Sequence, residues 1–239
     1  MRTVAVVDRL RPLWDFEDLD ASERRFREQL EREESDADRA EVLTQIARVA
    51  GLRGDFEACR RLLDEAERLA RSSEVAKVRI ELERGRMLRS DGDQAAAFPL
   101  FTSAFEHAND AGEHYLAGDA AHMAAIATPD RGEMERWTRR GLDLAEQEPD
   151  AAYWAGPLLN NLAWEYYEAC EYERALDLFN RALEARLRDP ANEAGIAWSR
   201  HGVAQALRAL GRDEEADVAM QPALEWAGRA GKPDGYFSG

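Results

Sequence analysis

The feature that most constrains the fold of this chain is a helical-hairpin pattern that recurs five times along its 239 residues. Each copy has small and large apolar residues at helical spacing, then a turn, then a second amphipathic run. The equivalent turn positions are Gly54, Gly92, Pro129, Cys170 and Gly211, separated by 38, 37, 41 and 41 residues. Because a single hairpin cannot bury its own apolar face, such copies must stack on their neighbours. The pattern therefore predicts an all-α chain with one repeat domain over residues 39–230.

The clearest copy spans residues 159–183. Its small and large apolar positions are Leu162, Ala163, Tyr166, Ala175, Phe179 and Ala182, with a turn at 171–173 between them. This pattern resembles the tetratricopeptide repeat (TPR), in which small and aromatic residues of a first helix are followed by alanine-x-x-x-phenylalanine in a second. The resemblance implies a right-handed α-solenoid of about five TPR-like helical hairpins. An ordinary helical bundle with coincidental periodicity is the alternative.

The other four copies share this register less closely. Their corresponding residues are Ile46, Ala47, Ala50, Cys59, Leu63 and Ala66; Gly85, Leu88, Ala97, Phe101 and Ala104; Ala121, His122, Ala125, Met134, Thr138 and Gly141; and Val203, Ala204, Leu207, Ala216, Met220 and Ala223. The turn spacings exceed the family's repeat length of about 34 residues. We expect the extra residues to lengthen a second helix, or its connection to the next hairpin, near 71–76, 108–113 and 147–154.

Both ends of the repeat array need a cover, because terminal repeats have no neighbour on one side. Residues 1–38 are expected to supply the N-terminal cap as a helix with the apolar stripe Leu19, Phe26 and Leu30, anchored by Trp14 and Phe16.

Residues 231–239 are read as a C-terminal tail. The last helix carries the apolar residues Met220, Leu224 and Trp226. Two coverings of this face stay open: Tyr236 and Phe237 fold back onto it, or a second copy of the chain packs there in a homodimer.

The resemblance implies that a ligand binds on the concave face of the stack, which is lined by the first helix of each hairpin. Inward positions lie six and three residues before the small crossing residue and one and four after it, which places them on one helical face. The candidate peptide-binding residues on this face are Arg48, Arg79, Arg86, Arg89, Asn160, Trp164, Tyr167, Trp198, His201, Gln205 and Arg208. Arginine is suited to carboxylates, asparagine to a peptide backbone, and aromatic rings to apolar side chains.

These residues predict a protein- or peptide-binding scaffold or adaptor that recognises a partly acidic, partly apolar segment in its groove. The competing interpretation is that the arginines pair with glutamates of adjacent helices, such as Glu81 and Glu83. A regulatory sensor of a small peptide or metabolite, and a structural subunit of a larger assembly, are the other open functions.

The sequence argues against several other classes. With 32 basic and 48 acidic residues, the net charge of −16 disfavours nucleic acid and anionic membranes as partners. The apolar run at residues 3–7 is too short for a signal peptide or membrane span, so we expect a cytoplasmic protein. Four histidines and two cysteines show no metal-ligand spacing, and we find no nucleotide-binding loop or nucleophile motif. We therefore expect no catalytic residues, metal or cofactor.

Overall fold

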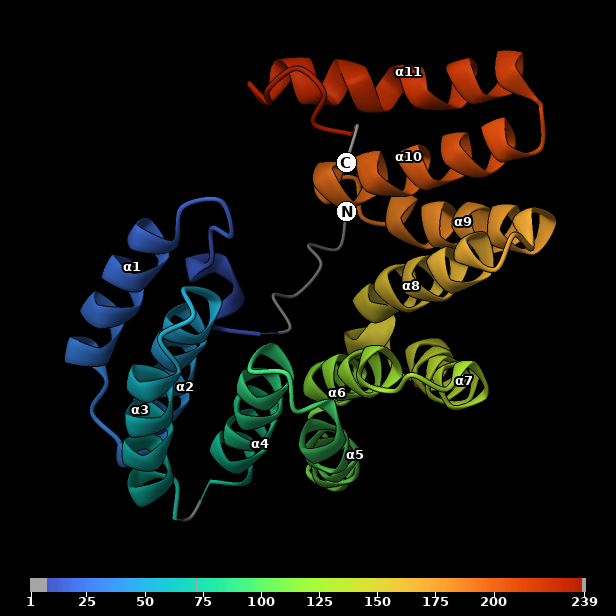
Figure 1. Ribbon diagram of the computed structural model, residues 1–239. Coiled ribbons are helices and arrows are strands. Elements are labelled where there is room, and N and C mark those ends of the chain that lie inside the picture. The colour runs from blue at the N-terminus through green and yellow to red at the C-terminus, as the bar shows by residue number, and fades with distance from the viewer. Residues whose placement is uncertain (1–7, 72, 238–239) are drawn as a thin grey trace. The chain divides into compact units, whose positions relative to one another are not determined.

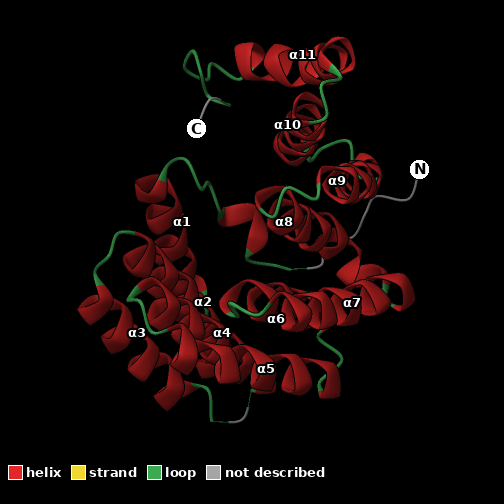
Figure 2. Ribbon diagram, turned by 45° about the vertical axis from the view of Figure 1, so that its right-hand side comes forward, coloured by secondary structure: helices red, strands yellow, loops and turns green. Residues whose placement is uncertain are grey.

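The computed structural model describes residues 8–71 and 73–237, and every regular element among them is a helix (Figures 1 and 2). The apolar run at residues 3–7 lies outside this described part. The chain divides into two compact units, Met1–Pro129 and Asp130–Gly239. The division falls at the turn of the third predicted hairpin, within the repeat domain expected over residues 39–230. It follows from local packing, because the first helix of that hairpin packs on the preceding two helices and the second on the two elements that follow.

The N-terminal unit is a stack of helices joined by short turns. Its elements are the 3₁₀ helix η1 (Arg11–Leu13) and the helices α1 (Leu19–Arg32), α2 (Asp36–Leu52), α3 (Phe56–Leu69), α4 (Glu74–Ser90), α5 (Gln94–Asp110) and α6 (His114–Ala127). The hairpins α2–α3 and α4–α5 pack closely, and α4 also lies against α2 and α6. This unit therefore consists of η1 and α1, two complete hairpins and the first helix of a third.

The C-terminal unit has the same construction. It contains α7 (Arg131–Gln147), the 3₁₀ helix η2 (Pro149–Trp154), α8 (Ala155–Glu168), α9 (Tyr172–Leu187), α10 (Glu193–Ala209) and α11 (Asp213–Arg229). The hairpins α8–α9 and α10–α11 pack closely, and α9 lies against α10. The extra residues expected near 147–154 form η2, whose Ala151 and Trp154 are buried.

Local signals in the sequence set where these helices begin and end. A side chain at the N-cap accepts a hydrogen bond from the backbone of the first turn at seven helices: Asp18, Ser35, Asp55, Ser73, Asp93, Asp130 and Asn192. Four of the five predicted hairpin turns contain a residue with positive φ: Gly54, Gly92, Cys170 and Gly211. Glycine adopts this conformation without strain. Cys170, with φ of 61°, is the one non-glycine residue in it among residues 8–71 and 73–237.

Close approach of neighbouring helices depends on small residues that face buried aromatic rings. A Cβ atom added to Gly85 of α4 would lie 2.5 Å from the Phe101 ring of α5, and one added to Gly202 of α10 would lie 2.5 Å from the Phe179 ring of α9. Both phenylalanines are fully buried, so neither ring has open space to move into. The sequence pattern names Gly85 but not Gly202, which lies one residue before Val203 of the fifth copy, so the close approach of α9 and α10 is found only in the structure.

Helix α1 packs on α2 at the start of the N-terminal unit. Phe26 is buried against Val42 and Ile46 of α2, and Leu19 and Leu30 border the same cluster. Trp14 lies edge-on to Phe26 and donates a hydrogen bond to Gln45, 2.9 Å away. The sequence assigns four of these residues to the N-terminal cap: Trp14, Leu19, Phe26 and Leu30. Phe16, the other predicted anchor, stacks on Trp14 at 4.6 Å but is 44% exposed.

We predict that the helix crossings tolerate no added methyl group. Gly85→Ala and Gly202→Ala should each lower the free energy of unfolding by about 1–3 kcal/mol, because the new Cβ would overlap a buried ring. Gly228→Ala is the matched control, since Gly228 lies in α11 with nothing within 4 Å of an added Cβ. Urea denaturation measures all three variants. A stability of Gly85→Ala or Gly202→Ala equal to that of Gly228→Ala would contradict this packing.

Candidate functional site

The eleven candidate binding residues fall into two groups, one in each unit. Four arginines lie in the N-terminal unit, Arg48 on α2 and Arg79, Arg86 and Arg89 on α4. The remaining seven lie on the first helices of two hairpins in the C-terminal unit. Asn160, Trp164 and Tyr167 are on α8, and Trp198, His201, Gln205 and Arg208 are on α10. Each group has its own chemistry.

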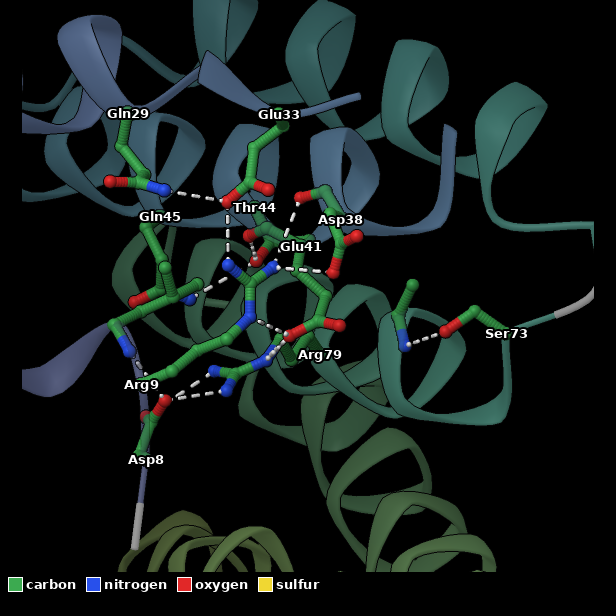
Figure 3. Close-up of polar contacts among 12 residues, drawn as sticks. Asp8, Arg9, Gln29, Glu33, Asp38, Glu41, Thr44, Gln45, Ser73 and Arg79 are labelled. Atoms are coloured by element: carbon green, nitrogen blue, oxygen red, sulfur yellow. Dashed lines mark hydrogen bonds and ion pairs between the residues drawn. The ribbon is translucent and has the colours of Figure 1, made fainter. Parts of the chain in front are cut away.

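Arg79 is a buried member of an ion-pair network that includes the start of the described chain. Its guanidinium Nη2 lies 2.7 Å from Asp8 Oδ1, and its Nε lies 3.2 Å from Glu41 Oε2. Arg9 adds contacts of 2.6 Å to Glu33 and 3.5 Å to Glu41. Figure 3 shows these side chains converging between α2 and α4. Arg79 therefore joins α4 to α2 and to the N-terminal segment.

Arg86 forms a second buried network. One terminal nitrogen contacts Asp119 of α6 through both carboxylate oxygens, at 2.5 and 2.6 Å, and the other pairs with Glu83. Glu83 and Asp119 are 3% and 5% exposed. Burial alone would raise the pKa of Asp119, but the positive charges of Arg86 and Arg48 hold it below its usual value. The guanidinium is therefore fully engaged by this unit's own carboxylates.

Arg48 and Arg89 are less completely paired. Arg48 Nη1 lies 3.8 Å from Glu83, and the guanidinium sits over the rings of Trp14 and Phe16. Its Nε is buried and has no hydrogen-bond partner among the described residues. Arg89 Nε donates to the carbonyl oxygen of Ile126 at 3.3 Å. Both arginines line a cavity of about 180 Å³.

The positive charge that the sequence places on this face is thus largely neutralised inside the N-terminal unit. The interpretation that arginines pair with neighbouring glutamates holds for Glu83, whereas Glu81 contacts His107 instead. Asp8 is a partner that the repeat pattern does not reveal, because it lies 71 residues from Arg79 and outside the repeats.

In the C-terminal unit, the predicted aromatic residues form a continuous face. The Trp164 ring lies 5.2 Å from Tyr167 and 6.0 Å from His201, and His201 lies 5.6 Å from Trp198. Trp164 also packs edge-on against buried Phe179, which fixes its orientation. We call Trp164, Tyr167, Trp198 and His201 the inner aromatic face. All four are among the candidate residues predicted from the sequence.

The polar candidates of this unit border that face. Gln205 Nε2 lies 3.0 Å from His201 Nε2. Asn160 Oδ1 is buried and has no hydrogen-bond partner among residues 8–71 and 73–237. Arg208 pairs with Asp217 at 3.0 Å and is exposed. A buried amide oxygen without a hydrogen-bond donor is energetically costly, so this atom of Asn160 requires a donor that the described residues do not supply.

The C-terminal segment completes this surface. Phe237 is 5% exposed and stacks on His201 at 5.3 Å. Tyr236 lies 5.4 Å from Trp198 and 6.0 Å from Trp226. Of the two coverings expected for the last helix, the structure contains the folded-back tail. Met220 and Trp226 are buried, whereas Leu224 stays 52% exposed.

The described residues show neither a metal site nor a membrane-spanning helix. They contain no group of three or more histidine, cysteine, aspartate or glutamate side chains arranged to hold a metal ion. Within the same residues, none of the helices combines the length and apolar character that crossing a membrane requires.

Among comparisons with known proteins, only the one with solved structures gave a similarity, and it concerns the fold. No protein-family model matches the chain, and no curated protein sequence is significantly similar to it. Among solved structures, the chain is similar to BtubC (BKLC) from P. vanneervenii, with a TM-score of 0.69 and 15% sequence identity. The similarity covers 94% of this chain and 93% of that one. It supports an all-α helical-repeat fold over nearly the whole chain.

We predict that Arg86 is required for stability. Arg86→Met should lower the free energy of unfolding by about 3–5 kcal/mol, because Glu83 and Asp119 would remain buried without their cation. Arg61→Met is the control, since Arg61 and Glu57 form an exposed pair one turn apart on α3. Chemical denaturation measures both. An Arg86→Met variant as stable as the control would show that the buried network is dispensable.

We also predict acid sensitivity at His122 of α6. Burial lowers the pKa of His122 to about 4. The negative charge of Asp119 raises this pKa, whereas the positive charges of Arg86 and Arg48 lower it. The unfolded chain therefore binds this proton more readily, so the free energy of unfolding should fall as the pH drops from 6.5 towards 4, by at most about 3 kcal/mol.

His122→Gln should make this pH dependence shallower between pH 6.5 and about 5, because glutamine does not titrate. Urea denaturation of both proteins at several pH values measures the slope. Parallel curves for the two proteins would assign the acid sensitivity to other groups.

Proposed function

We propose that this chain is a TPR-like scaffold that binds an extended peptide segment of a partner protein on the inner aromatic face of its C-terminal unit. The observation that carries the proposal is the continuous run of Tyr167, Trp164, His201 and Trp198 along α8 and α10. Aromatic rings held by packing supply large contact areas at little cost in conformational entropy. The right-handed stacking of the TPR family is part of this proposal.

Asn160 also supports binding of a peptide backbone, because this residue is half-buried and its amide oxygen lacks a donor among the described residues, so that rotation of the side chain would let a peptide N–H supply one. The apolar part of the expected ligand is better supported than the acidic part. In the N-terminal unit, Arg79 and Arg86 already contact buried carboxylates, so an acidic segment would depend on Arg48 and Arg89.

Selection of random twelve-residue peptides on the immobilised chain tests this function. We expect the selected peptides to be rich in apolar residues and to bind Tyr167→Ala and Asn160→Ala at least tenfold more weakly than the native chain, which corresponds to about 1.4 kcal/mol for each substitution. Val218→Ala should bind normally, since Val218 is an apolar residue of α11 that is 75% exposed. Peptides whose affinity is the same for all four proteins would refute binding at this face.

A further inference from the structure

The segment after α11 reverses direction and returns to α10 (Figure 1). Gly231 and Gly235 have φ of 65° and 79°, which permits two tight changes of direction. The backbone N–H of Lys232 donates to the carbonyl oxygen of Ala227 at 2.9 Å and starts the reversal. Two glycines therefore place Tyr236 and Phe237 against the preceding helices.

These two side chains occupy an aromatic site built by α10 and α11. Phe237 lies parallel to the His201 ring, with an interplanar angle of 26°, and edge-on to Trp198 at 5.0 Å. Tyr236 lies between Trp198 and Trp226. We call Trp198, His201 and Trp226 the aromatic clamp.

The rest of the segment is held less closely. Pro233, Asp234 and Gly235 are exposed. A cavity of about 540 Å³ lies between the segment and the two helices, lined by Gln205, Arg208, Met220 and Leu224 among others. Dense packing is the rule inside proteins, so a space of this size marks a contact that is not part of the core. The two rings are thus the main anchors of a segment that bridges a cavity.

We propose that the aromatic clamp is a recognition site for an extended peptide with two adjacent aromatic residues, and that Tyr236 and Phe237 are its intramolecular occupant. This inference rests on the proposed function, since Trp198 and His201 belong to both the clamp and the inner aromatic face. A partner segment lying along α8 reaches the clamp at His201, 6.0 Å from Trp164, and must displace the tail to continue.

The tail competes with a free peptide for the aromatic clamp because it is covalently attached next to it. A tethered occupant has an effective concentration in the millimolar range, and the apparent affinity of a free ligand falls with the fraction of open sites. The tail therefore selects for partners whose aromatic residues fit the clamp better than its own, and it prevents weaker segments from binding.

The test uses a fluorescent octapeptide with the sequence of residues 232–239 and the 239-residue chain. We expect the double variant Tyr236→Ser, Phe237→Ser to bind this peptide at least tenfold more tightly than the native chain in fluorescence anisotropy. Adding Trp198→Ala to the double variant should abolish this gain. A peptide with serine in place of both aromatic residues should not bind. Equal affinity of the native chain and the double variant overturns the proposal.

Circular dichroism and a cooperative thermal transition establish that the double variant is folded. If it is not, Tyr236→Ala replaces it, because Tyr236 is only half-buried, and a threefold gain in affinity is then expected. Failure of a folded variant to bind the octapeptide also overturns the proposal. If the selected peptides still depend on Tyr167 and Asn160 in that case, only the clamp is refuted. If they do not, the proposed function fails with it.

Discussion

Close contact between a glycine and a buried phenylalanine ring is the constraint on which the helix packing of this chain depends. Gly85 against Phe101 holds a hairpin together, and Gly202 against Phe179 joins one hairpin to the next. The same type of contact thus serves within and between hairpins. Because both rings are fully buried, these contacts set how closely the helices approach at the two places. The inner aromatic face lies beside one of these contacts, since Trp164 packs edge-on against Phe179 and His201 directly precedes Gly202.

Charge has different roles in the two units. In the N-terminal unit, arginines contact carboxylates that are almost completely removed from water. Loss of one partner of such a pair strongly destabilises the protein, because the other charge stays buried without a counter-charge or water around it. The contribution of these pairs is therefore the alignment of α2, α4 and α6. In the C-terminal unit, Arg208 pairs at the surface, while the inner face is aromatic. The candidate binding surface therefore lies in the C-terminal unit, where the side chains are aromatic rings and not arginines already paired with carboxylates.

The sequence was sufficient for the features that local physics determines. Turn residues such as Gly54 and Gly211, and N-caps such as Asp55, act within a few residues of themselves, so their pattern predicts helix ends. Helical periodicity likewise predicts Trp164 and Trp198 for one face, and in the structure both rings lie within 6.0 Å of the His201 ring. The pairing of Arg79 with Asp8 could not be predicted, because it depends on how a segment outside the repeats returns across α2 and α4. The covering of α11 could not be predicted for the same reason. An apolar helix face indicates that another segment must bury it, but it does not indicate which segment.

The end of a helical stack and a peptide-binding site pose the same physical problem, which is an apolar surface that requires an occupant. In this chain one helix meets both needs. Gly202 of α10 packs on Phe179 of the preceding hairpin, and the adjacent His201 packs on Phe237 of the tail. The tail covers the last hairpin with the same kind of ring that the inner aromatic face would bind in a partner. Under the proposed function, covering the end and binding a partner segment are alternative uses of His201 and Trp198, and whichever segment packs better on these two rings would exclude the other.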